Sequence, residues 1–387
     1  MSAPETSPAG SGDPVGQPGT ATDPDPAPAP VDELAGEPEA VTAADEETAV
    51  EPRRRLLAAV WANPLSVTFL ALVMIVVAFS VLAPANTFAT TENFKLLAQN
   101  VAILTVVSVG TTFVIITGGV DLSIPSGIVL GEVFAVKFLS WIPVGSGTAV
   151  DVQADQTTAW YLLFALLGSV LAGLALGLVN GFAVGYMRIP PLLATLGTLG
   201  AGLGIALLLQ NGVNIATYAL NPVASGELIP GVPNLIVIAA VVVVFGAVLL
   251  HLSVFGRHTF AIGSNSEAAR RVGIKVERHL LRVYVLGGVA SGLAGYLSVA
   301  YFSTTSVAGH STDNLQAITA VALGGTSLFG GVGTVIGTLI GVWIPAVLKN
   351  GFVILGVQPY WQDVAVGFVL ILAVWLDQLR RRSRDRR

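Results

Sequence analysis

The residues with the clearest chemical potential lie where an apolar stretch of the chain is interrupted. Residues 117–127 read TGGVDLSIPSG, between two runs long and apolar enough to cross a membrane. Gly118 and Gly119 weaken a helix, and Asp121 stands where the next helix should begin, with Pro125 in its first turn. The run therefore predicts a break between two helices, followed by an aspartate cap, at or near membrane depth.

Irregular backbone at membrane depth is tolerated only where it lines a cavity or is packed within protein. One interpretation places Thr117, Asp121 and Ser123, with the intervening glycines, on a polar translocation path. The alternative makes Asp121 a helix cap and nothing more. Thr195 and Thr198 in a later apolar run are further candidates for the path, although such threonines often bond to carbonyls of their own helix.

A second candidate site is the basic loop at residues 255–282, FGRHTFAIGSNSEAARRVGIKVERHLLR. Ser264 and Glu267 have the spacing of a capping box, which predicts a short helix through Arg271, and Gly273 fits its C-terminal cap. Two turns of helix are unstable alone, so this helix needs a surface to bind. We expect that surface to be a partner protein rather than anionic lipid, contacted by Ser264, Asn265, Glu267, Ala268, Arg270 and Gly273.

Other kinds of chemistry find no support in the sequence. The chain has no cysteine, which excludes disulfides, thiol catalysis and cysteine-bound metals, and its four histidines have no metal-like spacing. The glycine-rich run at 324–333 lacks the lysine of a phosphate-binding loop. It predicts helix packing instead, continued by Gly337 and Gly341 at four-residue spacing. We therefore expect no catalytic residue, no metal, no cofactor and no ATPase activity of the chain's own.

The elements that hold these residues follow from an apolar composition. Hydrophobic residues make up 53% of the 387 residues, charged residues make up 11%, and the mean hydropathy is +0.76. Soluble domains carry roughly a quarter charged residues, and a soluble fold this poor in charge would expose too much apolar surface. The composition predicts an all-α membrane protein.

The net charge of −5 combines two unlike segments. Residues 1–52 hold twelve acidic residues, no basic residue and ten of the 21 prolines. Such a segment buries too little apolar surface to offset the entropy of ordering, so we expect a disordered, cytoplasmic acidic tail. Residues 53–382 form the predicted transmembrane domain, and residues 383–387 form a basic C-terminal tail.

About ten membrane spans are predicted from runs of mostly apolar residues. They are 65–83, 98–117, 121–141, 160–187, 192–210, 234–254, 283–302, 315–330, 333–349 and 363–379. With the N-terminus in the cytoplasm, ten crossings place 16 of the 19 basic residues in cytoplasmic loops and tails. We therefore predict a multi-pass protein of the bacterial plasma membrane with both termini cytoplasmic.

A weak internal echo links the two halves of the chain. The fourth span ends in Asn180-Gly181-Phe182 and the ninth in Asn350-Gly351-Phe352. Five spans separate the two triplets, so a duplicated unit would be inverted, as in many transporter folds.

Several motifs resemble those of ribose-type sugar permeases, which are subunits of ABC importers. Residues 261–274, AIGSNSEAARRVGI, are similar to the coupling segment of such permeases, and residues 118–123, GGVDLS, resemble a signature of the ribose-type members. Leu196-Gly197-Thr198, Asn180-Gly181 and the glycine-rich run match further family patterns. The resemblance covers about residues 60–380 in the same order.

The resemblance implies a fold, partners and a mechanism. The fold would be the inverted-repeat-like ABC importer permease fold, which translocates a pentose or hexose into the cytoplasm. The partners would be an ABC ATPase subunit, an extracytoplasmic sugar-binding protein and a second permease subunit, with membrane lipid around them and no nucleic acid. The alternatives are an ABC permease for branched-chain amino acids or nucleosides, or an ion-coupled secondary transporter.

Overall fold

The computed structural model describes residues 64–85, 87–140 and 159–358, together with positions 360–362, 364, 367 and 368. The chain divides into two units, Met1–Arg55 and Leu56–Arg387, and every described residue belongs to the second. The predicted acidic tail, the basic C-terminal tail and most of the span predicted at 363–379 lie outside the described residues.

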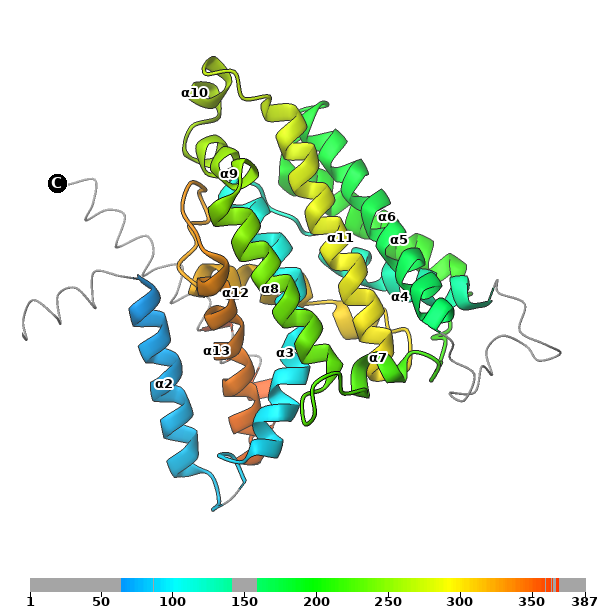
Figure 1. The fold of residues 1–387 in the computed structure, drawn as a ribbon, viewed down its shortest axis with the longest axis vertical. Helices are drawn as coiled ribbons and strands as arrows, with labels where there is room; N and C mark the ends of the chain where they lie inside the picture. The colour runs from blue at the N-terminus through cyan, green and yellow to red at the C-terminus, as the bar shows by residue number, and fades with distance from the viewer. Residues whose placement is uncertain are drawn as a thin grey trace, which may run out of the picture. The chain divides into compact units, whose positions relative to one another are not determined.

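Every regular element in the described part of the chain is a helix, which confirms the all-α prediction (Figure 1). Within the described ranges, seven helices are long and apolar enough to cross a membrane: α2 (Pro64–Leu82), α3 (Thr91–Ile116), α5 (Ala159–Gly185), α6 (Pro191–Leu209), α8 (Asn234–Leu252), α11 (Val276–Phe302) and α13 (Val335–Ile354). The shorter helices are α4 (Ile124–Ser140), α7 (Asn221–Ser225), α9 (Val254–Ser264), α10 (Ser266–Arg271), η4 (Ala308–His310) and α12 (Asp313–Leu323).

The seven long helices coincide with seven predicted spans, and the span predicted at 121–141 corresponds to α4, with 17 residues. The span predicted at 315–330 is wrong, because α12 has only 11 residues and ends at Leu323. Gly325, Gly330 and Gly331 adopt φ angles of 82°, 91° and 77°. These left-handed conformations favour glycine and end a helix, so residues 324–334 form a loop, called the glycine loop below.

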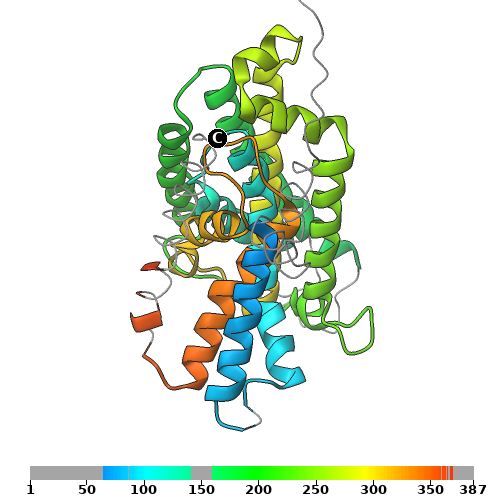
Figure 2. The same cartoon turned by 90° about the vertical axis from the view of Figure 1, so that its left-hand side faces the viewer.

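The long helices differ in how much of their surface the chain itself covers. Most of α3 and α11 is buried, whereas α2, α6 and α8 turn apolar side chains outward, as expected of helices that face lipid or another subunit. Helix α2 lies beside α13 in both views (Figures 1 and 2), where the Phe79 ring fits against Gly351.

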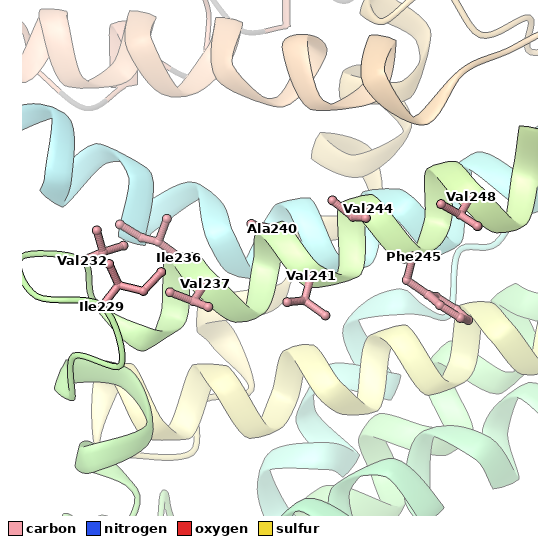
Figure 3. Close-up of a pocket in the computed structure, with 9 residues that line it drawn as sticks. All are labelled: Ile229, Val232, Ile236, Val237, Ala240, Val241, Val244, Phe245 and Val248. Carbon is pink, nitrogen blue, oxygen red and sulfur yellow. The ribbon is translucent and has the colours of Figure 1, made fainter.

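A shallow groove along the outer face of α8 shows the same apolar character. Only apolar side chains line it, between Ile229 in the preceding loop and Val248 near the end of the helix (Figure 3). It offers no polar group to a sugar or an ion, so we do not include it in the candidate functional site.

Close packing of α5 on α11 depends on glycine. Gly173 and Gly177 of α5 face Gly288 and Gly292 of α11, and a Cβ atom on Gly173 or Gly288 would collide with backbone atoms of the facing helix. In α13, Gly337 and Gly341 meet the backbone of α12 and of the glycine loop's first residue in the same way. The predicted use of small residues for helix packing is therefore confirmed at Gly337 and Gly341.

Two sets of three helices run in opposite directions. The order long, short, long occurs in α3–α4–α5 and again in α11–α12–α13. Helices α3 and α5 both end near α9, α10 and the start of α11. The Ile116 carbonyl at the end of α3 accepts a hydrogen bond from the glycine loop, and Gly185 at the end of α5 lies against Glu277 of α11. Helix α11 begins at this end, called the α10 end below, and α13 runs away from it (Figure 1). The element order thus supports the inverted echo.

The echoing asparagines occupy matching places, each within the last six residues of its helix. Asn180 of α5 bonds to residues of the α3–α4 loop and α6. Asn350 of α13 forms a reciprocal amide pair with Asn93 in the first turn of α3 (2.9 and 3.0 Å). Both asparagines therefore join one long helix to other segments of the bundle.

Candidate functional site

The glycine pair after α3 ends that helix as the sequence predicts. Gly118 has a φ of +79°, and the N–H groups of Gly118 and Gly119 donate to the carbonyls of Ile115 and Val114. This double closure is a Schellman motif. The Thr117 hydroxyl donates to the Val114 carbonyl (2.7 Å), so this side chain serves the helix end.

Asp121 is buried in the loop that follows, but it does not cap α4 as expected. Its Oδ1 accepts hydrogen bonds from the N–H (2.8 Å) and the hydroxyl (2.6 Å) of Ser123, which closes a turn ahead of the helix. Helix α4 begins directly after Ser123, with Pro125 in its first turn as predicted. A Cβ atom on Gly287 would lie 3.8 Å from Asp121 Oδ2, which places the carboxylate beside the middle of α11.

Asn180 connects the Asp121 turn to α6. Its side-chain N–H donates to the Ser123 hydroxyl (2.7 Å), while its Oδ1 accepts from the Thr198 hydroxyl (2.6 Å). Ser126 also donates to the carbonyls of Ser123 (2.7 Å) and Thr198 (3.3 Å). Residues from three distant segments therefore form one buried polar network, called the Asp121 network below.

The two threonines of α6 lie at this network and also bond within their helix. Thr195 donates to the Pro191 carbonyl (2.8 Å) and lies 3.4 Å from the Val120 carbonyl. Thr198 lies 3.2 Å from the Ala194 carbonyl, besides its bond to Asn180. The structure thus brings Asp121, Ser123, Thr195 and Thr198 together, and both threonines also bond to carbonyls of their own helix, while their place on a path stays a prediction.

Gly118 and Ile116, at the end of α3, lie at a different contact. The Gly331 N–H donates to the Ile116 carbonyl (2.9 Å), and a Cβ atom on Gly331 would meet Ser264 at the end of α9. The glycine loop therefore lies between the end of α3 and the end of α9. It links the start of the Asp121 loop to the predicted partner-binding segment, a role that the sequence did not indicate.

The predicted short helix exists as α10, with its cap one residue later than expected. The Asn265 side chain accepts from the Ala268 N–H (2.9 Å), so Asn265 is the N-cap and Ser264 is the last residue of α9. The capping box of Ser264 and Glu267 is therefore wrong. Gly273 does end the helix, with a φ of +88° and a Schellman motif completed by the Ile274 N–H.

Helix α10 turns one side to the protein and the other to solvent. Ala269 is buried in a small apolar cluster with Ile262 and Val276, whereas Val272 is 78% exposed, and Ala268 and Glu267 are exposed as well. Arg270 pairs with Glu277 of α11 at 2.6 Å, a contact that holds α10 to the bundle. All six predicted partner contacts thus lie on or beside one short segment, with an apolar residue at its surface.

A cluster of charged side chains that the sequence analysis did not identify is buried near the far end of α11. Glu132 of α4 accepts hydrogen bonds from the Ser298 hydroxyl (2.7 Å) and the Ser306 N–H (2.8 Å), and it pairs with His310 Nε2 (2.9 Å). His310 Nδ1 pairs with Asp313 at 2.7 Å. A glutamate inside a predicted span was the only available signal, because its partners meet it only in the folded chain.

The same contacts fix the charge of His310. Burial by itself would lower the pKa of His310, but hydrogen bonds with Asp313 and Glu132, and the negative charge of both, outweigh it and raise the pKa to about 10. Within the described residues, no three His, Cys, Asp or Glu side chains are arranged to hold a metal ion.

The fold and these sites define a multi-pass membrane transport protein. The family described as "Branched-chain amino acid transport system / permease component" matches residues 93–374. The chain is 37% identical over 317 residues to the ribose import permease protein of Bacillus subtilis, covering 80% of this chain and 91% of that protein. The fructose import permease protein of Rhizobium meliloti is 31% identical, covering 83% and 87% of the two chains.

A probable ABC transporter permease protein of Sinorhizobium fredii is 34% identical and covers 76% of this chain and 83% of its own. No solved structure matches the chain significantly. The chain belongs to the ribose-type family of ABC importer permeases, which confirms the family that the motifs indicated. It is accordingly a transport subunit of the inner membrane and not an enzyme.

The raised pKa of His310 predicts a stability that depends on pH. The pKa of His310 lies near 10 in the folded chain and near 6.5 in the unfolded chain. Protonated His310 therefore contributes fully to the free energy of unfolding below pH 6.5, and this contribution is lost as the pH rises to about 10. We expect the unfolding temperature of the wild type in detergent to fall over this range. The unfolding temperature of His310→Gln should fall less over this range. Near pH 6 the variant should be less stable than the wild type by a few kcal/mol.

His251→Gln provides the matched control, since His251 lies on the exposed surface of α8. Its unfolding profile should follow the wild type at every pH. Parallel profiles for His310→Gln and the wild type would contradict the charge assigned to His310.

Proposed function

We propose that the chain is the permease subunit of an ATP-driven importer that carries a simple sugar, a pentose or hexose, into the cytoplasm. One observation carries the proposal. A buried polar network at Asp121 is joined, through the glycine loop, to a capped and exposed α10 on which a partner could act. The ribose and fructose permeases among the relatives supply the substrate class.

A partner ATPase would bind the exposed side of α10. ATP binding would shift the equilibrium between two access states only if the partner binds the α10 segment differently in each. The route inward is short, because Ser264 touches Gly331 and Gly331 bonds to Ile116 at the start of the Asp121 loop. Movement of α10 would therefore reach the loop through backbone contacts.

The sugar path would run where the Asp121 loop meets α6. Carboxylate, hydroxyl and amide groups are the partners that sugar hydroxyls require. We assign Asp121, Ser123, Thr195 and Thr198 to this path. Thr117, Gly118 and Gly119 would shape the loop that carries them. A sugar-binding protein would deliver substrate at the end opposite α10, and the basic residues near α10 would face the cytoplasm with both termini.

The outer face of α6 fits a second copy of the chain. Among the described residues, no atom outside the adjoining turns of α6 lies within 4 Å of a Cβ atom built on Gly197, Gly200 or Gly204, and small residues at such spacing let two helices approach closely. We expect Gly200→Leu to shift the detergent-solubilised protein toward single copies at an unchanged unfolding temperature, measured by light scattering. An unchanged mass would place the second subunit elsewhere.

The transport function is tested in vesicles that hold the permease together with a partner ATPase and a sugar-binding protein. We expect uptake of ribose or a hexose to require ATP and to survive collapse of ion gradients. Uptake that follows the ion gradients would favour a secondary transporter. Uptake of leucine or a nucleoside but of no sugar would favour the other ABC importer classes.

A change on the exposed side of α10 tests the partner contact. Glu267→Ala combined with Val272→Ala should reduce the ATPase retained on tagged permease about tenfold and abolish substrate-stimulated ATP hydrolysis. The unfolding temperature should not change, because both side chains lie on the surface. Glu92→Ala at the opposite end of the bundle is the control and should retain the ATPase fully. Equal retention by both variants would contradict this contact.

Asp121→Asn tests the path. The amide oxygen can still accept both hydrogen bonds from Ser123, so the turn should form, whereas the second carboxyl oxygen is replaced by an NH2 group that cannot accept a hydrogen bond. We expect uptake to fall about tenfold or more at equal expression and equal unfolding temperature. Wild-type uptake would show that the carboxylate serves the turn alone.

A further inference from the structure

The buried charges around Glu132 have no part in the α6 side of the network or in the contact at α10. The Glu132 side chain is fully buried, and the side chains of His310 and Asp313 are 6% and 17% exposed. Charges buried in this way bring a desolvation cost that apolar side chains of similar volume would avoid. Ionisable groups among membrane helices are therefore candidates for a functional role.

This cluster joins segments that are otherwise separate. Glu132 comes from the middle of α4, His310 from η4 and Asp313 from the first residue of α12, while Ser298 adds α11. The imidazole has one carboxylate on each ring nitrogen, so its position and its ring plane are both fixed. The contacts thereby hold the first turn of α12 against the side of α4.

The next residue of α12 reaches the Asp121 loop. The Asn314 side-chain N–H lies 3.3 Å from the Leu122 carbonyl, between the two residues that form the turn. The first turn of α12 therefore holds the Glu132 cluster through one residue and the Asp121 turn through its neighbour. Asn314 is itself buried, so water does not replace this bond readily.

We propose that Glu132, His310 and Asp313 are positioning residues for Asp121: they fix the first turn of α12 on α4, and Asn314 then fixes the Asp121 turn. Hydrogen-bonded charges suit this task because they specify one alignment of two helices, whereas apolar contacts alone tolerate sliding. The expected effect on transport rests on the proposed function, but the effect on the loop does not.

The absence of cysteine from the chain allows a direct measurement of the loop. Leu122→Cys places a thiol at a partly buried position of the Asp121 loop, and Val347→Cys places one in the fully buried contact of α13 with α2. Each is labelled with N-ethylmaleimide in the full-length permease, purified in detergent. The rate at position 122 reports opening of the loop, and the rate at position 347 reports general loosening.

We expect His310→Gln and Asn314→Ala each to raise the labelling rate at position 122 about tenfold more than the rate at position 347. The double variant should label no faster than the faster single variant, because His310 acts through Asn314. His251→Gln is the matched control and should change neither rate. Unchanged labelling at position 122, or an equal rise at both positions, would overturn the proposal.

Uptake measurements separate the positioning role of Glu132 from the proposed transport function. In vesicles, Glu132→Gln should lower uptake as Asp121→Asn does, and the two changes together should lower it no further. Additive losses would overturn the positioning role even if labelling rises. If the wild type carries no sugar, the proposed function fails, whereas the labelling result still decides how the loop is held.

Discussion

The architecture depends on one constraint: backbone that leaves a helix inside an apolar bundle must find hydrogen-bond partners within the protein. The Asp121 loop meets it with the Schellman motif after α3, with the Asp121 side chain, which accepts from the Ser123 N–H, and with side chains from α6 and α12. The segment before α12 satisfies part of its backbone through Glu132, which accepts a hydrogen bond from the Ser306 N–H. Several buried side chains, among them Asp121, Glu132 and Asn314, bond to backbone at these breaks, and the residues proposed for the transport path lie at the first break.

The short helices follow from the same constraint. Helices α4 and α12 end or begin at breaks, so neither reaches the length of its neighbours, and each must be held from the side. Glycine surfaces allow the long helices to approach closely enough for this, as between α5 and α11. The backbone of α11 then comes near the Asp121 carboxylate at Gly287, and an added methyl group at positions such as Gly173 would push the layers apart.

The sequence predicted what local patterns determine. Apolar length located seven long helices, and the glycine pair at 118 and 119 and Gly273 marked two helix ends correctly. The predictions were wrong where the local sequence fits two structures. Ser264 and Asn265 are both good caps, and continuation of α9 through Ser264 decides for Asn265. The glycine loop is apolar enough to resemble a span, but three of its residues adopt left-handed backbone.

Contacts between residues far apart in the sequence could not be predicted from local patterns. Asn180 appeared only as part of a repeated triplet, although it joins Ser123 to Thr198. His310 lies 178 residues from Glu132, and nothing in the local sequence of either residue specifies the other. Such pairs follow from the inverted arrangement of α3–α4–α5 and α11–α12–α13, which brings the two short helices and their breaks to the same interior.

That arrangement also gives the Asp121 loop two separate supports. At its start, Ile116 is held by the glycine loop, which touches α9, and at its centre Leu122 is held by α12. The first support consists of backbone contacts at glycines, where no side chain can absorb a displacement of α9. The second consists of directional bonds anchored on buried charge. A displacement of α10 would therefore act on the start of the loop, while Leu122 at its centre stays bonded to α12. The loop would turn about Leu122 instead of moving as a whole.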